Sequence, residues 1–153
     1  MKRIAENWMK FSGLSWPERR TLLAAMAWLP LFWLGLRVLG LRRLQAWLQR
    51  DKLPIEHCLT LDDAVRIASL VNIAARHIPF PATCLTRSLL LGWILRRRGV
   101  ASRLRLGVRL TEVVFDAHAW VEYKGRPIND TQENVERFAA FNETLAPIPD
   151  SPI

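Results

Sequence analysis

The spacing of apolar residues changes once along this chain, near Gly99, and that change limits the folds open to it. Before residue 99, apolar side chains recur at the three- and four-residue intervals of helices. After it, the stretch at 102–110 (SRLRLGVRL) alternates apolar residues with arginines, which indicates a half-buried strand. Helices followed by antiparallel strands predict an α+β fold for this chain.

The first third of the chain combines a helix-start signal with a long apolar run. The stretch at 15–18 (SWPE) matches a capping box, so we expect a helix from about residue 16. The run at 21–36 holds 16 uncharged residues, fewer than the roughly 20 that span a bilayer, and Pro30 should kink or split it. We therefore favour a buried or interfacial hairpin over a single-span anchor, followed by an amphipathic segment at 41–50.

Positive charge is concentrated in the same third. Residues 1–50 hold nine Lys and Arg against two acidic residues, and five of the seven tryptophans, whereas residues 51–153 hold thirteen basic against twelve acidic residues. Arginine with tryptophan suits nucleic acid, an anionic membrane or an acidic protein, and equally a solvated basic face. We expect no nucleic-acid partner, and peripheral membrane contact through residues 16–50 stays open.

Two cysteines, Cys58 and Cys84, and no recognisable secretory signal predict free thiols in a reducing cytoplasm. The three histidines are scattered, without CxxC or HxxxH spacing, and the glycine-rich nucleotide motifs are missing. We therefore expect a cytoplasmic protein that needs neither a metal nor another cofactor, with membrane association as an open alternative.

Cys84 stands at the start of an expected helix. Pro81 and Thr83 precede it, and the apolar block that follows ends at three arginines and Gly99, which suits the position just after a helix. In a first turn, partial positive charge and free N–H groups favour a thiolate and can hold an oxyanion. A cysteine alone at such a position is more often structural, so its partners decide the interpretation.

Two later residues supply the partners that a nucleophile needs. His118 lies on the polar face of a strand expected at 113–123, and Asp130 ends the short strand that follows the turn at Lys124-Gly125. A hairpin can set them side by side, so that the carboxylate orients one imidazole nitrogen and the other takes the thiol proton. Separately, a hydrogen-bonded strand histidine and an aspartate before a turn would be unremarkable. Together with Cys84, in this order, they predict a thiol enzyme.

Other candidates have simpler interpretations. Cys58 lies in a connector and is expected to be structural, and His77 closes a helix that Thr60 should cap at 61–78, where a cation suits the dipole. Asp116 is a rival carboxylate, but side chains two apart on a strand point in parallel and seldom bond. Trp120 shares the face of His118 and would contact substrate in a groove, or else pack on the sheet.

Residues 84–130 also carry a specific set of motifs. They are Cys-Leu-x-Arg-Ser-Leu at a helix start, an arginine-rich helix end, an alternating Arg/Leu strand, and Ala-His-Ala-Trp-Val-Glu before a glycine and an aspartate. In these motifs the chain resembles the stand-alone leader peptidases of lasso-peptide biosynthesis, members of the transglutaminase-like cysteine-protease superfamily. The resemblance implies that Cys84 is the nucleophile, His118 the general base and Asp130 its orienting carboxylate. The first 80 residues match only in being helical, tryptophan-rich and apolar.

The resemblance also implies a reaction and partners. Such peptidases hydrolyse one peptide bond to remove the leader from a ribosomally made precursor peptide, with a separate leader-recognition protein, and an ATP-using lasso cyclase acts next. The papain-type Cys-Gly-x-Cys-Trp surround is absent, and no glutamine oxyanion donor is identified before Cys84. The alternatives are a non-catalytic membrane- or partner-docking adaptor and a transglutaminase-like acyltransferase.

The sequence further predicts two regions. Residues 1–56 should form a basic, apolar helical region, and residues 57–153 a papain- or transglutaminase-like core. In that core a helix bears the cysteine and an antiparallel sheet bears the histidine and the aspartate. The prolines after residue 146 predict an irregular C-terminal tail.

Overall fold

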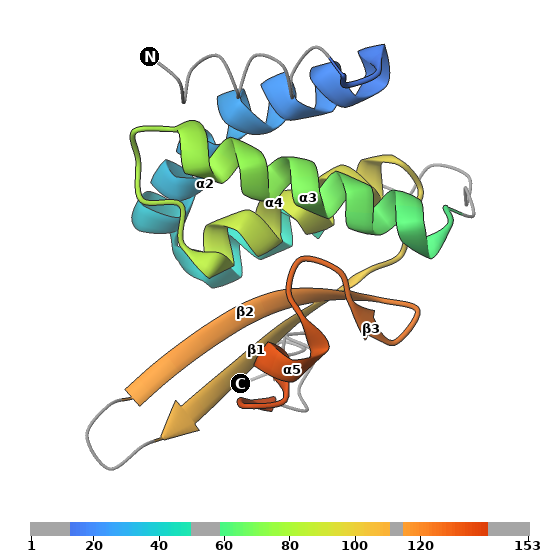
Figure 1. The fold of residues 1–153 in the computed structure, drawn as a ribbon. Helices are drawn as coiled ribbons and strands as arrows, with labels where there is room; N and C mark the ends of the chain where they lie inside the picture. Colours follow the sequence, from blue (N-terminus) through green and yellow to red (C-terminus); the bar gives the residue numbers. More distant parts are fainter. Residues whose placement is uncertain (1–12, 50–58, 111–114, 141–153) are drawn as a thin grey trace, which may run out of the picture.

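A layer of helices covers one face of an antiparallel sheet (Figure 1). The computed structural model describes residues 13–49, 59–110 and 115–140. The elements, in chain order, are α2 (Trp16–Gln49), α3 (Leu61–His77), α4 (Cys84–Arg97), β1 (Arg103–Leu110), β2 (Phe115–Tyr123), β3 (Arg126–Pro127), α5 (Gln132–Val135) and β4 (Ala139–Ala140). The predicted α+β class, with helices before an antiparallel sheet, is confirmed.

The sheet has the strand order β3-β2-β1-β4, and β1 and β2 form its long central hairpin. Their register sets Gly107 of β1 opposite His118 of β2. On the other side of β1, Gly107 and Val108 pair with Ala140 and Ala139 of β4. The short elements α5 and β4 were not predicted from the sequence, because two to four residues are too few to show a periodic pattern.

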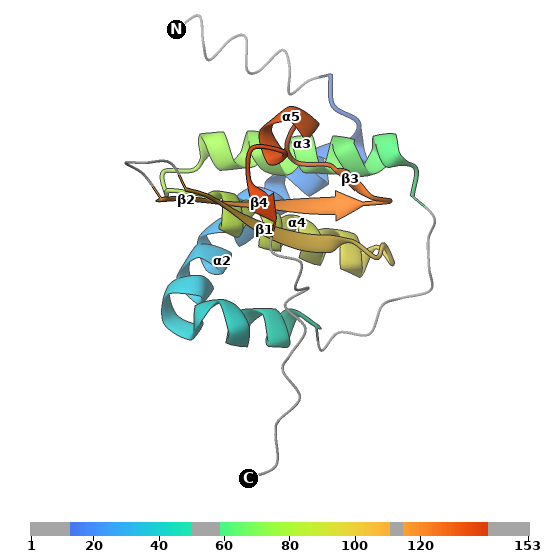
Figure 2. The same cartoon turned by 90° about the horizontal axis from the view of Figure 1, so that it is seen from below.

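The helix α4 lies at the centre of the molecule. Figure 2 shows it behind the sheet, with α3 along one side and the second part of α2 along the other. Leu90, Leu91 and Leu95 of α4 are completely buried, and each such side chain contributes roughly 1.5–3 kcal/mol through burial. This packing fixes α4 against both the other helices and the sheet, and so fixes where its first residue, Cys84, lies.

The long helix α2 breaks at Gly40, whereas the sequence predicted a kink or a split at Pro30. Pro30 lies within the helix, while Gly40 has φ 75° and ψ 167°. Proline removes one backbone hydrogen bond but keeps a helical φ, so a helix can continue through it at a cost. A reversal of direction through positive φ is open mainly to glycine, which places the break at Gly40.

One face of α2 packs into the core and the other is apolar but exposed. Leu22, Ala25 and Leu29 are buried at helical spacing, whereas Leu31 and Val38 are 54% and 71% exposed. By length and composition alone, α2 is long and apolar enough to cross a membrane, a property it shares with core helices of soluble proteins. The predicted division of the chain at residue 57 stays a prediction.

Candidate active site

The start of α4 has the geometry expected from its sequence. Thr83 is the N-cap: its backbone is extended, and its hydroxyl accepts a hydrogen bond from the Thr86 N–H at 3.2 Å. The N–H groups of Cys84 and Leu85 have no hydrogen-bond partner within the described part of the chain. Cys84 therefore opens a helix whose first free donors lie beside its own sulfur.

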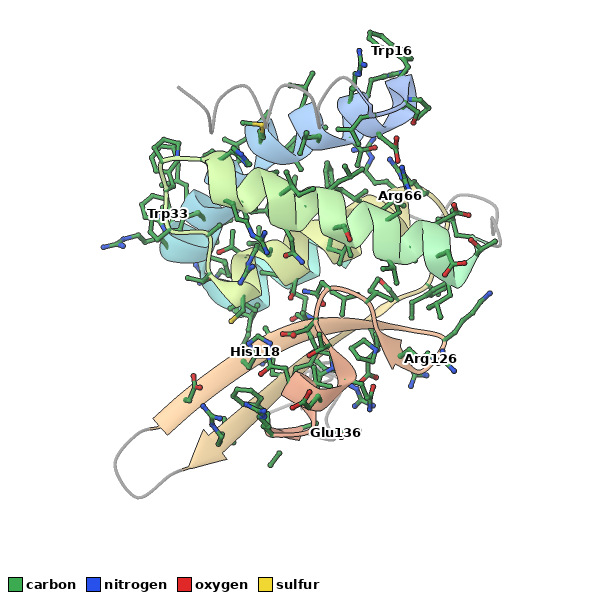
Figure 3. All side chains as sticks on the ribbon, in the orientation of Figure 1. Trp16, Trp33, Arg66, His118, Arg126 and Glu136 are labelled. Atoms are coloured by element: carbon green, nitrogen blue, oxygen red, sulfur yellow. The ribbon has the colours of Figure 1, made fainter. Side chains whose placement is uncertain are left out.

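Cys84, His118 and Asp130 line one cavity of about 200 Å³ between α3, α4 and β2. Cys84 comes from the start of α4 and His118 from the middle of β2, and Figure 3 shows His118 on the sheet just below the helical layer. Asp130 was predicted to end the short third strand, but β3 ends at Pro127, so Asp130 lies in the segment after it. The other lining residues are Asn72, Arg76, Arg87, Ala119 and Asn129. The three residues singled out in the sequence are therefore brought together at one cavity.

His118 and Asp130 form a short hydrogen bond. The Nε2 atom of His118 lies 2.5 Å from Oδ2 of Asp130, and both side chains are mostly buried. Because a carboxylate can only accept, Nε2 is the protonated ring nitrogen in this pair. The Nδ1 atom is then left as the acceptor that a thiol proton requires.

Three donors hold the carboxylate of Asp130. Oδ1 accepts from the Thr131 N–H at 2.7 Å, and Oδ2 accepts from the Asn134 amide at 3.0 Å as well as from His118. Partial burial works to raise the pKa of Asp130, but the hydrogen bonds from Thr131, Asn134 and His118 outweigh it and lower that pKa. Asp130 is therefore ionised at neutral pH and keeps the tautomer of His118 fixed.

A buried polar chain connects α4 to the segment that carries Asp130. The Ser88 hydroxyl donates to the Ala119 carbonyl at 3.0 Å and accepts from the Asn129 amide at 2.9 Å. Asn129 also accepts from the Val121 N–H at 2.8 Å. Because Ser88 is completely buried, losing one of these bonds would leave an unpaired polar group in the core. The network ties together the elements that carry Cys84, His118 and Asp130.

The sequence interpretation missed Ser88 and Asn129, although each left a trace. Ser88 lies four residues after Cys84 and directly before a run of three leucines, and Asn129 directly precedes Asp130. A polar side chain on the buried face of a helix needs a partner, but the sequence does not say which residue supplies it. That partner depends on the tertiary fold.

Aromatic side chains support the ring of His118. Its centroid lies 6.1 Å from that of Trp120 and 5.0 Å from that of Phe138, near the start of β4. Gly107, opposite His118, gives them room, since a Cβ there would come within 2.8 Å of Phe138 and 2.9 Å of Trp120. Trp120 is only 2% exposed and donates from Nε1 to Glu122. This position favours packing behind His118 over the predicted contact with substrate.

The remaining candidates lie outside the arrangement around Cys84. Asp116 pairs with Arg109 at 3.0 Å, while Asp130 is the carboxylate bonded to His118. His77 ends α3 and its Nδ1 lies 2.8 Å from the Ile73 carbonyl, as a helix-end residue would. Cys58 lies outside the described residues. Within the part of the chain that the structure describes, no three His, Cys, Asp or Glu side chains group as metal ligands.

A comparison with protein families matches residues 25–143 to the transglutaminase-like superfamily. The chain belongs to that superfamily. The match starts inside α2 and covers the cavity and all three residues that were predicted to be catalytic. Searches of curated proteins and of solved structures found no match. Membership is compatible with two kinds of thiol chemistry, peptide-bond hydrolysis and acyl transfer.

Proposed function

We propose that this chain is a cysteine peptidase that removes the leader from a ribosomally made lasso-peptide precursor. The observation that carries the proposal is the meeting of Cys84, His118 and Asp130 at one cavity, at the start of a helix. The motifs at 84–130 direct it toward leader peptidases within the superfamily. A leader-recognition protein would deliver the precursor, and an ATP-using cyclase would take the freed core peptide.

The proposed reaction begins with the thiol of Cys84. His118 takes its proton at Nδ1, and the sulfur attacks the scissile carbonyl to give a tetrahedral oxyanion, which the N–H groups of Cys84 and Leu85 stabilise. Collapse breaks the C–N bond, and the leaving amine takes the proton from His118. Water, deprotonated by His118, then hydrolyses the thioester, releasing the leader acid and regenerating the thiol.

Asp130 has a positioning role in this scheme. Its hydrogen bond to Nε2 keeps Nδ1 free to accept a proton and stabilises the imidazolium that forms after proton transfer. The donors around Asp130 keep it ionised, so it stays an acceptor through both steps. The thiolate–imidazolium pair is thereby supported from the side opposite to the substrate.

Cleavage of a precursor tests the proposal directly. The chain is mixed with a lasso precursor and its recognition protein, and leader release is followed by mass spectrometry. We expect Cys84→Ala to lower cleavage by a factor of about 10³ or more, because it removes the nucleophile. Cys58→Ala, the same change at the other cysteine, should leave the rate intact. Unimpaired cleavage by Cys84→Ala would rule out the assignment.

The superfamily also supports a second reaction, acyl transfer. In that case an amine, instead of water, attacks the same thioester, and the first half of the scheme is unchanged. Adding a primary amine during cleavage separates the two reactions. A leader that leaves as the free acid supports hydrolysis, and a leader that leaves mainly as the amide supports acyl transfer.

We also propose that the protein acts in the cytoplasm and touches a membrane surface through α2. The exposed apolar side chains of this helix, among them Leu31 and Val38, and the arginines in and before it suit an anionic interface. Flotation with anionic and neutral liposomes tests this. If the protein floats with neither kind of liposome, the proposed membrane contact through α2 is contradicted.

A further inference from the structure

The wall of the cavity beside Cys84 is cationic. Every lining residue except Ala119 carries a polar, charged or thiol side chain, and two of them are arginines, Arg76 and Arg87. Asp130 is the one acidic residue among the described residues that line the cavity, and its oxygens are already held by Thr131, Asn134 and His118. Among the residues that the structure describes, the cavity lining therefore holds two guanidinium groups and no carboxylate that is free to pair with them.

The hydrogen-bond partners of the two arginines also show that their positive charges are not paired with a carboxylate among the described residues. Arg87 donates from Nη1 to the side-chain oxygen Oδ1 of Asn72 at 3.4 Å, a long hydrogen bond to a neutral group. Its Nε atom is buried without a hydrogen-bond partner among the described residues. Arg76 has no ion pair or hydrogen bond within the same part of the chain. A buried donor such as Nε of Arg87 is costly unless a ligand satisfies it, whereas Arg76 is exposed at the cavity.

The positions of these arginines place their charge next to the reacting sulfur. Arg87 lies three residues after Cys84 on α4, so the two side chains share a helix face. Arg76 lies four residues after Asn72 on α3, which puts both on the wall opposite α4. A group held between the two arginines would therefore lie in the same cavity as Cys84, next to a scissile bond at its sulfur.

We propose that Arg76 and Arg87 form a subsite for a carboxylate on the peptide substrate, next to the scissile bond. A planar guanidinium recognises a carboxylate through paired N–H donors, and a carboxylate is the anion that an unmodified peptide carries. A volume of about 200 Å³ is below the range of about 300–1,000 Å³ typical of small-molecule sites, and suits one side chain or chain end. The inference rests on the proposed thiol chemistry.

The carboxylate has two sources in a peptide, an acidic side chain or the α-carboxylate of a chain end. An acidic side chain would make the subsite select where an internal bond is cut. An α-carboxylate would make it select substrates with a short segment beyond the scissile bond. Both present the same anion to the arginines, so separate probes are needed to tell them apart.

Alkylation of Cys84 tests the subsite without requiring turnover. Iodoacetate and iodoacetamide react with the same thiolate, so the ratio of their rates cancels the thiolate fraction and reports the attraction of the anionic reagent. We expect Arg87→Gln and Arg76→Gln each to lower this ratio about fivefold, because each removes one charge from the cavity wall. Mass spectrometry of the peptide that contains Cys84 separates its labelling from that of Cys58.

Two further variants control this experiment. Arg126→Gln makes the same change on β3, outside the cavity lining (Figure 3), and should leave the ratio unchanged. Arg87→Lys keeps the charge and should keep most of the ratio even if Arg87→Gln unfolds. If the ratio in Arg87→Gln or Arg76→Gln matches that of Arg126→Gln in folded protein, the subsite is overturned. Absence of precursor cleavage would overturn the peptidase proposal while leaving this ratio as it is.

Protection from iodoacetamide identifies the source of the carboxylate. N-acetylglutamate amide carries only a side-chain carboxylate, N-acetylglutamine only an α-carboxylate, and N-acetylglutamine amide neither. The subsite predicts that at least one of the two acids slows Cys84 labelling severalfold at millimolar concentration, and that Arg87→Gln abolishes the protection. Whichever acid protects better indicates whether the carboxylate comes from an acidic side chain or from a chain end. Equal labelling with all three compounds would contradict the proposal.

Discussion

The two ends of α4 face cavities of similar size but opposite character. The start of the helix borders the cavity of about 200 Å³ that holds Cys84, His118 and Asp130. The second half borders a cavity of about 190 Å³, lined by residues such as Leu89, Trp93 and Val100, and its described lining includes no cysteine, histidine or acidic side chain. The two cavities therefore differ in their titratable side chains and not in their volume.

The two ends of α4 also differ in whether their backbone groups have hydrogen-bond partners. At the last turn, Gly99 has φ 73° and donates to the Arg96 carbonyl, and the Val100 N–H donates to the Leu95 carbonyl, which closes the helix in a Schellman-type arrangement. At the first turn, the N–H groups of Cys84 and Leu85 lack partners among the described residues. One end satisfies its backbone groups internally, and the other keeps donors available for a reacting oxygen.

Among the substitutions that test this difference between the two ends of α4, Asp130→Asn should have the largest effect on activity. Three donors converge on its two oxygens, and an asparagine would turn an NH₂ group toward one of them, whichever way the amide lies. Losing the fixed His118 tautomer should lower kcat/KM for leader cleavage by about 10²-fold or more.

Asp116→Asn is the matched control for that experiment. It makes the same change two residues from His118, in a carboxylate that pairs with Arg109. We expect a change in kcat/KM of less than about twofold, because exposed ion pairs contribute little. If both variants lost activity equally, the proposal that Asp130 is the carboxylate that orients His118 would be contradicted.

Much of this site was predicted from sequence because its signals are local. Thr83 before Cys84, and Gly99 after the arginines, mark both ends of α4 within one turn each, and both are as predicted. The hairpin turn at Lys124-Gly125, where both residues have positive φ, brings the Asp130 segment back beside β2. Short-range cap and turn chemistry was therefore enough to predict the elements that carry Cys84, His118 and Asp130, while the packing of α4 on the sheet brings the three residues together.

What could not be predicted depends on contacts distant in sequence. The Ser88–Asn129 hydrogen bond joins residues 41 apart, and the packing of Phe138 on His118 depends on the unpredicted strand β4. The break at Gly40 in place of Pro30 was also missed, because either residue can end a helix and tertiary packing decides. Such features leave no periodic signal in the sequence.

At the closed end of the helix, Gly99→Ala should reduce stability without reducing activity. Alanine at φ 73° costs roughly 1–2 kcal/mol of folding free energy, because its Cβ approaches the backbone. The site lies a helix length away, fourteen residues or roughly 20 Å, so kcat/KM below the melting transition should be unchanged. Urea unfolding and leader cleavage measure the two effects.

Gly92→Ala provides the control within the same helix. A Cβ at Gly92 meets no atom within 4 Å, and alanine is the better helix former by about 0.5–1 kcal/mol. We expect no loss of stability from this variant. A loss equal to that of Gly99→Ala would show that any added methyl group on α4 is harmful and that positive φ is not the cause.

At the open end, Thr83→Ala should reduce both stability and reactivity. It removes the acceptor of the Thr86 N–H and the hydroxyl contact with Thr86 Oγ1 at 2.9 Å, at a cost of about 1 kcal/mol. Because fraying of the first turn also displaces Cys84, its alkylation by iodoacetamide at pH 7 should slow severalfold.

Thr60→Ala removes an equivalent cap from α3. Thr60 accepts from the Asp63 N–H at 3.1 Å, away from the residues that line the cavity. It should cost a similar amount of stability by urea unfolding while leaving Cys84 labelling unchanged. Slower labelling in both cap variants would mean that general loosening, and not the start of α4, controls the thiol.

The smallest expected effect is a difference in how the stability losses caused by substitutions at the two ends of α4 depend on acid pH. The pKa of Asp130 is lowered from its ordinary 3.8, so ionised Asp130 stabilises the fold above about pH 4. That contribution is lost as the pH falls through the folded pKa. The stability gap between wild type and Asp130→Asn, from urea midpoints, should therefore narrow as the pH falls below 4.

The gap between wild type and Gly99→Ala should instead stay constant over the same pH range, because backbone strain does not titrate. The hydrogen bond from Arg66 is the main cause that lowers the pKa of Glu18 to about 2, and it acts equally in all three proteins, so it cancels in both differences. If the stability differences of both variants from wild type narrowed in parallel, the acid-sensitive group would lie outside the His118–Asp130 pair. A gap that narrows only for Asp130→Asn would assign the acid sensitivity to the His118–Asp130 pair beside the start of α4.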